Sequence, residues 1–425
     1  MNGHPQSSVS RIRPDRVWLL LLVLPMTFRT FTFFPVLSQL QEVWNALSFL
    51  YFLLIYPGWF SRNFKITSAF EWYIVGLIIL APFLTALAAW REFSQPFLYG
   101  LLAQRSVAVI ASVLFLLRGM REKWITLREL ERAMLVLAWG TAVLYVATKV
   151  TLNPANFSSY PGFTLGAEEF AFQGYFIFFG MIYYAFIALR RQQPKYYALA
   201  LLLLVCGVQK KGMRQGLLFL FLTFFFFAYR WLDGGRLLRL LPKALLIFTV
   251  MIGALFVLSP DSTTEMAGKF NDLFTVILAG NNVEDPSANA RIGESAIALT
   301  GFVKHPLLGN GKISVQWQGG TSSVLGDYFD ANDVGLLGMF FSLGIVGVVL
   351  YSGQFFFAYF ALRRIPGDYY SPMLDAVKGV LFNFGLSSIS NGAFVPDVTI
   401  LLIFVLLLRA MREEAVQQKA LTLEG

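Results

Sequence analysis

Long apolar runs alternate with short polar connections from residue 17 to residue 410. A run of about 20 apolar residues is long enough for a helix to cross the hydrocarbon core of a bilayer. The sequence therefore predicts an all-α polytopic membrane protein with about 12 transmembrane helices. The predicted spans are 17–37, 43–60, 69–90, 97–117, 133–151, 168–189, 196–209, 214–232, 241–259, 331–361, 375–390 and 394–410.

One long stretch, 260–330, has no apolar span. A loop of roughly 70 residues is far longer than two neighbouring helices need, which favours a functional role. Within it, Asp285-Pro286-Ser287 predicts a helix start, and 287–303 has the pattern of an amphipathic helix lying across the membrane face. The predicted organisation is thus spans 1–9 in 1–259, the loop, spans 10–12 in 331–412, and a polar tail at 413–425.

Composition supports the membrane assignment and sets the predicted orientation. The chain is 56% hydrophobic and only 14% charged, whereas a soluble protein carries about 25% charged residues. Most of the 34 lysines and arginines fall in alternate loops, and such an excess marks the cytoplasmic side. Both termini are therefore expected in the cytoplasm and the loop 260–330 outside it. The net charge of +9 then reflects topology and is no evidence of a nucleic-acid partner.

Several kinds of chemistry find no support in the sequence. The only histidines are His4 and His305, and the single cysteine, Cys206, lies in an apolar run. There is no Cys/His cluster, phosphate-binding glycine loop or dinucleotide fingerprint, so we expect no metal site and no cofactor. The energy for any reaction must then come from the substrate or from an ion gradient.

Three cations stand together on the predicted outer side, where lysine and arginine are disfavoured. They are Lys210, Lys211 and Arg214, at the head of a span. Either they anchor the span end, or they form an anion site, to which the N-terminus of a helix adds positive potential.

Three further arginines raise the same question. Arg105 lies near the head of the fourth predicted span, where it needs water or a polar partner. It is a substrate-binding candidate or one half of a structural pair. Arg29 is a weaker case, because threonines make its span polar. Arg291 is either a binding residue or the partner of Glu294 in a surface ion pair.

Carboxylates gather where the loop re-enters the membrane. Asp330 and Asp333 head the tenth predicted span, and either could accept a proton from a sugar hydroxyl. The alternative is that they only stabilise the helix dipole. Trp317 could stack on a sugar ring or simply pack within the loop.

Three motif blocks resemble those of the bacterial O-antigen polymerase and O-antigen ligase superfamily. The first is Gly212–Gly216, similar to a Ser-Arg-Gly type motif. The second is Arg291 followed by His305–Gly311, similar to His-Pro-Leu-x-Gly-x-Gly. The third is Asn332–Gly338, followed by Gly344–Gly347.

The resemblance implies a membrane-embedded, metal-independent glycosyltransferase acting on undecaprenyl-diphosphate-linked glycans outside the cytoplasm. It implies that Arg214 and Arg291 hold the diphosphate. Ligase-type members carry a His-Asn pair where this chain has Ala331-Asn332, which favours a polymerase of surface polysaccharide. Asp330 and Asp333 are then grouped with the two arginines as catalytic candidates. The substrate-binding candidates are Lys210, Lys211, Arg105, His305, Asn332 and Trp317.

Two alternatives remain open at this point. One is an O-antigen ligase that moves finished glycan onto lipid A-core. The other is a lipid-linked oligosaccharide or ion-coupled transporter. The expected location is the bacterial inner membrane with the site facing the periplasm, and the expected partners are the lipid-linked glycan, the bilayer, a chain-length regulator and a flippase.

Overall fold

The computed structural model describes residues 15–30, 35–54, 68–151, 174–208, 214–231, 286–326, 329–331, 333–392 and 394–424. These residues form helices and connections, with no strand among them, which confirms the predicted all-α class. The helices are α1 (Val17–Thr27), α2 (Pro35–Leu54), α3 (Ala69–Phe93), α4 (Phe97–Leu102), η2 (Arg105–Ile110), α5 (Ala111–Arg121), α6 (Leu127–Thr151), α7 (Tyr175–Arg191), α8 (Pro194–Val208), α9 (Arg214–Trp231), α12 (Pro286–Lys304), α13 (Thr321–Leu325), α14 (Gly335–Arg363), α15 (Pro372–Asn391) and α16 (Val398–Glu424).

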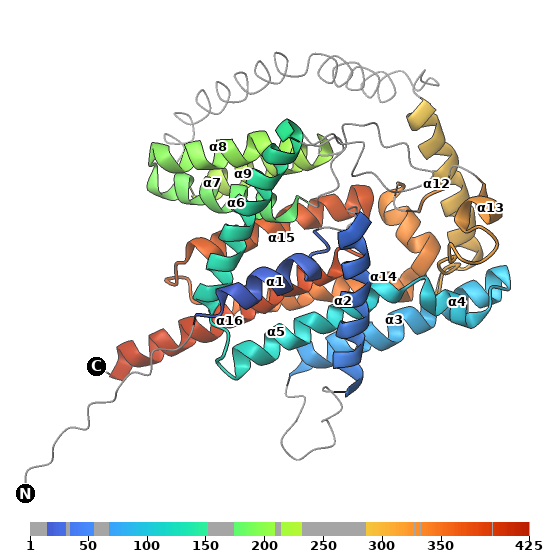
Figure 1. Cartoon of the computed structure of the whole chain (residues 1–425), viewed down its shortest axis with the longest axis horizontal. Coiled ribbons are helices and arrows are strands. Elements are labelled where there is room, and N and C mark those ends of the chain that lie inside the picture. Colours follow the sequence, from blue (N-terminus) through green and yellow to red (C-terminus); the bar gives the residue numbers. More distant parts are fainter. Residues whose placement is uncertain are drawn as a thin grey trace, which may run out of the picture.

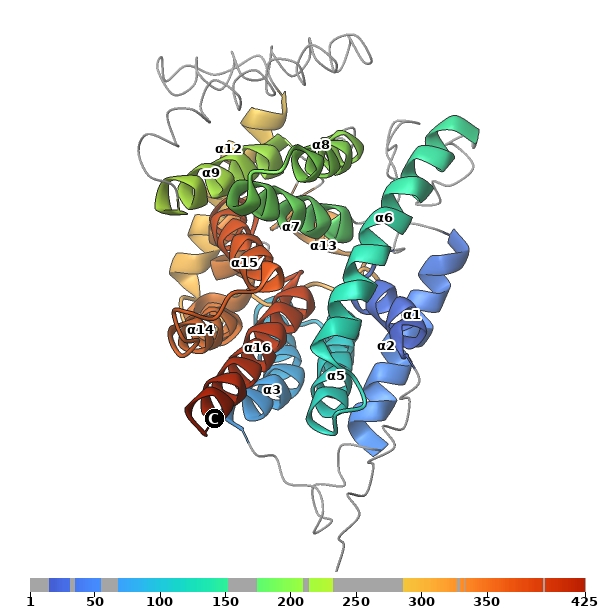
Figure 2. The same ribbon diagram turned by 90° about the vertical axis from the view of Figure 1, so that its left-hand side faces the viewer.

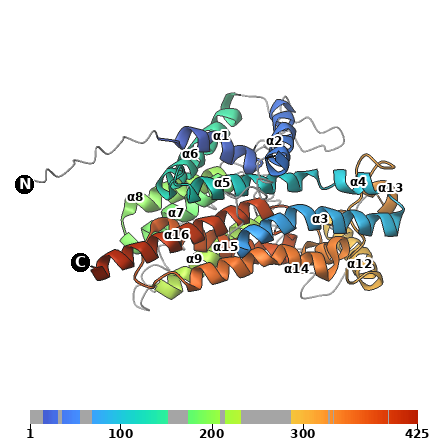
Figure 3. The same ribbon diagram turned by 90° about the horizontal axis from the view of Figure 1, so that it is seen from below.

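The bundle is built around α16. This helix runs beside α3, α5 and α14, as Figure 3 shows, and α15 packs against it as well. Every residue from Ile400 to Leu408 is buried, on all sides of the helix. A helix that is apolar all round belongs in a core and not at a surface. Seen from the end, α15 lies above α16, α14 lies on one side of it, and α3 and α5 lie on the other (Figure 2).

Three of the described helices are long and apolar enough to cross a membrane. They are Ala69–Phe93, Leu127–Ala147 and Gly335–Arg363. Large apolar side chains are exposed along them, including Phe83 on α3 and Phe356 on α14, which are 49% and 62% exposed. Continuous exposed apolar surface of this kind is expected in lipid and not in water. These helices indicate a membrane protein.

Two predicted spans are interrupted in the structure. The first, 17–37, ends as a helix at Thr27, and α2 begins at Pro35. The fourth, 97–117, is divided into α4, the 3₁₀ helix η2 and α5. Its polar residues Gln104 and Arg105 stand at the junction of α4 and η2. The predicted ninth span, 241–259, lies outside the described residues.

Arginines collect at one end of the bundle, here called the arginine-rich end. Glu71, at the start of α3, binds Arg121 at 2.6 Å and also forms a capping box with Ser68. Arg190 binds Asp375 at 2.6 Å. The arginines of this end are Arg118, Arg121, Arg190, Arg191, Arg363, Arg364, Arg409 and Arg412, from the last turns of α5, α7 and α14 and from the C-terminal half of α16.

The opposite end carries the C-terminal end of α3, together with α4, α12, α13 and the N-terminal half of α14 (Figure 1). We call it the loop end. It contains the described part of the predicted long loop and the junction where that loop joins α14. The candidate site residues of the loop are therefore far along the bundle from the arginine-rich end.

Candidate functional site

The helix α14 breaks at Gly344, where φ is 61° and ψ is −173°. In an unbroken helix the next two N–H groups would donate to carbonyls four residues earlier. At the break they donate elsewhere: Ile345 to the carbonyl of Pro306 at 2.8 Å, and Val346 to the carbonyl of Leu307 at 3.0 Å. The predicted second motif block thus bonds directly to the third.

The same segment also takes up the carbonyls that the break releases. The N–H of Asn310 donates to Phe341 at 2.8 Å, and the N–H of Gly311 donates to Ser342 at 2.9 Å. The amide side chain of Asn310 donates to Phe341 as well, at 3.1 Å. Four backbone bonds to the segment 305–311, together with the side-chain bond of Asn310, therefore replace two bonds within the helix. A buried backbone group left without a partner costs about 1–3 kcal/mol, so the break and the segment stabilise each other.

Glycine is required where these two backbones meet. Gly309 has φ 67°, and a Cβ there would lie 2.5 Å from the backbone nitrogen of Gly344. Gly311 has φ 85° and lies directly against the backbone of Ala89 in α3. Both positions combine a left-handed backbone with an approach too close for a side chain.

Glu92, in the last turn of α3, holds the start of the segment. One carboxylate oxygen binds the Lys304 ammonium at 2.6 Å, and the other forms a short contact with Nε2 of His305. The Lys304 side chain is 63% exposed, whereas those of His305 and Glu92 are 20% and 17% exposed. The contact with His305 is thus the better shielded of the two, and it fixes this candidate residue against α3.

Two neighbours of Glu92 hold the rest of the segment. Arg91 donates to the carbonyl of Gly309 at 2.9 Å. Gln95 donates to the carbonyl of Lys312 at 3.2 Å and accepts from the N–H of Ser314 at 2.7 Å. The C-terminal end of α3 therefore determines where Lys312 lies.

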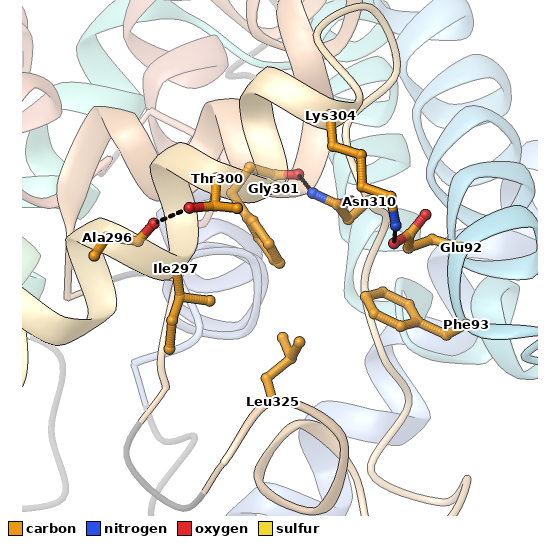
Figure 4. Close-up of a pocket in the computed structure, with 10 residues that line it drawn as sticks. Glu92, Phe93, Ala296, Ile297, Thr300, Gly301, Lys304, Asn310 and Leu325 are labelled. Carbon is orange, nitrogen blue, oxygen red and sulfur yellow. Dashed lines mark hydrogen bonds and ion pairs between the residues drawn. The ribbon is translucent and has the colours of Figure 1, made fainter.

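A pocket of about 420 Å³ opens beside this assembly, between α12, α13 and the end of α3. Figure 4 shows Glu92 and Lys304 at one side of it and Ile297 and Leu325 at the other. Its remaining lining is Phe93, Ala296, Thr300, Gly301, Asn310 and Phe341. The lining is mostly apolar, with a single ion pair at its edge.

A further cation directly follows the end of α1. Phe28 is the C-cap of α1, and Arg29 follows it with φ 54°. The N–H of Arg29 donates to Met26 at 3.2 Å, and that of Thr30 donates to Pro25 at 2.9 Å. These two bonds form a Schellman motif, whose left-handed position is usually glycine. An arginine there stores strain, which is a recurrent feature of functional sites.

Lys312 lies close enough to Arg29 and Asp330 for their charges to interact. Burial lowers the pKa of the Lys312 ammonium, the positive charge of Arg29 lowers it further, and Asp330 opposes the shift. Arg29 also acts electrostatically on Tyr175, whose hydroxyl donates to Asp397 at 2.5 Å.

The structure places the described candidates as follows. Asp330 and Asp333 are exposed next to each other, with the N–H of Asp333 donating to the carbonyl of Asp330 at 3.0 Å. Glu294 of α12 accepts from the N–H of Asp330 at 3.2 Å. Trp317 is partly buried in the loop, and its backbone N–H donates to the carbonyl of Ser314.

Arg105 forms a bidentate ion pair with Glu42 at 3.1 Å, in which both side chains are 52% exposed. The predicted polar partner is thus a carboxylate on α2.

The other candidates are placed only in part. Lys210, Lys211 and Asn332 lie outside the described residues. Arg214 is the first residue of α9, and Arg291 lies within α12, but their side chains are not among those described. His305, Trp317, Asp330 and Asp333 therefore all lie on the loop end, and Asp330 and Asp333 are the two described candidates that contact each other.

Sequence reasoning did not single out Glu92 or Gln95, because a polar residue at the end of an apolar span is ordinary. Lys312 was not singled out either. The one local signal was its position directly after Gly311, in the second motif block.

Comparison of the sequence with known protein families finds no match, and neither does comparison with curated proteins. Among the described residues, no group of three or more His, Cys, Asp or Glu side chains could hold a metal ion. The loop end combines cations, exposed carboxylates and an apolar pocket.

Proposed function

We propose that this protein is a polymerase of bacterial surface polysaccharide, acting on glycans linked to undecaprenyl diphosphate. The observation that carries the proposal is that two motif blocks hydrogen-bond to each other at the break in α14. The segment 305–311 and the region around Gly344 are the blocks that resemble the polymerase and ligase superfamily, and they complete each other's hydrogen bonds. The contact between the two blocks supports the resemblance, because two unrelated short sequence similarities would have no reason to lie against each other.

The distribution of charge supports an outward-facing site. Arginines line the end of the bundle opposite the loop, and arginine and lysine mark the cytoplasmic side of membrane proteins. The proposed topology therefore keeps about twelve spans, with both termini in the cytoplasm and the loop end in the periplasm.

In the proposed reaction, a growing chain on undecaprenyl diphosphate is the donor and a new lipid-linked repeat unit is the acceptor. The acceptor hydroxyl oxygen forms a bond to the anomeric carbon of the donor, and the bond from that carbon to the diphosphate breaks. The proton passes to Asp330 or Asp333, which are exposed beside each other at the loop end. Undecaprenyl diphosphate leaves.

Catalysis of this step depends on stabilising the negative charge that develops on the leaving diphosphate. In the proposal Arg214 and Arg291 supply that stabilisation. At an effective dielectric constant near 20, a close arginine–phosphate contact contributes up to about 4 kcal/mol before desolvation. The arginine fork matches the geometry of phosphate oxygens.

The cellular test replaces each arginine with alanine in a deletion strain. We expect Arg214→Ala and Arg291→Ala to lower polymer formation about 100-fold or more, at normal protein levels. The matched control is Arg364→Ala at the arginine-rich end, which we expect to leave polymer unchanged. Polymer of normal length and amount from either Arg214→Ala or Arg291→Ala would contradict the assignment.

The banding pattern of the surface glycan from the deletion strain distinguishes a polymerase from a ligase. A polymerase deletion leaves a single repeat unit attached to lipid A-core. A ligase deletion leaves normal ladders that are unattached. If neither pattern changes, the transporter reading replaces both.

A further inference from the structure

The pocket beside α12 has no role in the proposed reaction. Its volume of about 420 Å³ is within the range of small-molecule sites, about 300–1,000 Å³. Ile297, Leu325 and Phe341 belong to its mostly apolar wall. Glu92 and Lys304 lie together at one side of it (Figure 4). The pocket therefore suits a ligand with an apolar body and one polar end.

The helix α12 gives the pocket its direction. Ile297, Thr300 and Lys304 line the pocket and are three or four positions apart, so they lie on one side of the helix. Along this side the helix leads from an apolar residue to the cation in its last turn. A hydrocarbon chain lying along α12 would therefore bring its polar end to Lys304.

The surface next to the pocket is apolar and exposed. Ile292, Leu299 and Val303 are all more than half exposed, and their spacing places them on the neighbouring side of α12. The remaining side, with Ala298, is buried. An exposed apolar stripe on an amphipathic helix is expected in contact with lipid. A chain from the bilayer can therefore reach the pocket over this stripe.

The polar side of the pocket carries both signs of charge. The Glu92 carboxylate binds the Lys304 ammonium at 2.6 Å and also contacts Nε2 of His305. An ammonium has three donors and a carboxylate accepts several hydrogen bonds, so each can take a further partner without separating. Glu92 would repel a headgroup whose only charge is negative, whereas a zwitterion with a phosphate and an ammonium complements both side chains.

We propose that the pocket binds a phospholipid with a primary ammonium in its headgroup, of the phosphatidylethanolamine class. One hydrocarbon chain occupies the space between α12, α13 and the end of α3. The phosphate accepts from Lys304, whose side chain is mostly exposed, and the headgroup ammonium donates to Glu92. This lipid site is independent of the proposed reaction. It adjoins the start of the segment 305–311, because Glu92 also contacts His305.

The test uses the purified full-length protein in phosphatidylcholine nanodiscs that contain a trace of phosphatidylethanolamine with a photoreactive acyl chain. After irradiation, mass spectrometry measures the labelling of peptides from α12 and α13. Three unlabelled lipids then compete with the probe. Phosphatidylethanolamine represents the zwitterion, phosphatidylglycerol an anionic phospholipid, and farnesyl phosphate a prenyl phosphate. The choline of the nanodisc lipid has no N–H to donate to Glu92.

Three variants alter the site. Lys304→Met and Glu92→Gln each remove one charge, and Ala296→Trp places a ring in the pocket from an exposed position of its lining. Lys195→Met is the matched control for the lysine, since Lys195 is exposed at the start of α8. Leu299→Trp is the control for the tryptophan, since Leu299 is exposed on α12 and does not line the pocket.

We expect unlabelled phosphatidylethanolamine to compete at a concentration at least about tenfold lower than either of the other two lipids. Lys304→Met and Ala296→Trp should lower labelling at least about tenfold, with both controls like the wild type and Lys304→Arg retaining labelling. Glu92→Gln should keep labelling but lose the preference for phosphatidylethanolamine over phosphatidylglycerol. A merely structural role of Glu92 would not change that preference.

Thermal unfolding in phosphatidylcholine alone provides the check on folding. Lys304→Met should unfold at the wild-type temperature, because an exposed ion pair contributes little to stability. Its loss of labelling then reports lost binding, even if Ala296→Trp does not fold.

Wild-type labelling of α12 and α13 in Lys304→Met overturns the site. Stronger competition by phosphatidylglycerol overturns the zwitterionic headgroup. Stronger competition by farnesyl phosphate assigns the pocket to a prenyl chain and overturns the phospholipid. An unchanged lipid preference in Glu92→Gln overturns the contact between Glu92 and the headgroup.

Discussion

At the residue level, the cations differ in how much free energy their positions cost on folding. Arg105 and Lys304 are exposed and paired with carboxylates, at little cost to folding. Lys312 is partly buried, and burial together with the positive charge of Arg29 holds its pKa below the usual value of 10.5. Between that lowered pKa and 10.5 the unfolded chain binds more protons than the folded one. The stability contributed at Lys312 therefore rises with pH through this window.

The lowered pKa of Lys312 gives a prediction about stability. Between that lowered pKa and 10.5 the wild type should become more stable relative to Lys312→Met as pH rises, because methionine binds no proton in either state. Thermal midpoints of both proteins from pH 7 to 10 test this. Parallel profiles would contradict the lowered pKa.

At the level of elements, the break in α14 links regions distant in sequence. The motif blocks around His305–Gly311 and Gly344–Gly347 were visible in the sequence, and so was the all-α class. Their mutual hydrogen bonds were not, because apolar periodicity reports which residues face a core and gives no information about which backbone groups pair across the chain. For the same reason 17–37 was predicted as one span, although α1 ends at Thr27.

The candidate site could be predicted only in outline. Exposed acids at the head of a helix, such as Asp330 and Asp333, follow from local pattern. The electrostatic influence of Arg29 on Lys312 does not, since Arg29 follows α1 and Lys312 lies in a loop nearly 300 residues later. Glu92 was missed because its role depends entirely on the position of His305 in three dimensions.

The break in α14 predicts a contrast between two glycines. Gly344→Ala should destabilise the protein by about 3 kcal/mol or more, because the new Cβ would collide with the backbone of Gly309 and Leu307 at a left-handed φ. Gly293→Ala in α12 meets nothing within 4 Å, so it should be neutral or stabilising by up to about 1 kcal/mol. Thermal unfolding of both variants in detergent provides the comparison. Equal midpoints would mean that the break is not required for the fold.

On the scale of the whole molecule, the arginine-rich end and the loop end lie at opposite ends of an apolar bundle. This separation predicts which end faces the cytoplasm. In a Cys206→Ala background, Val315→Cys should react with an impermeant maleimide in cells with a permeable outer membrane. Asp368→Cys should react only after the inner membrane is opened. Val315 is 81% exposed at the loop end, and Asp368 is exposed beyond α14 at the arginine-rich end. The reverse labelling pattern would invert the proposed orientation.

The most direct test of the account is a reaction with purified protein and a lipid-linked repeat unit, followed by gel separation of the lipid-linked products. The account predicts a ladder of lengthening products with release of undecaprenyl diphosphate, and loss of the ladder in Arg214→Ala. Folded protein that leaves the repeat unit unchanged, or that transfers it only when lipid A-core is added, would contradict the polymerase.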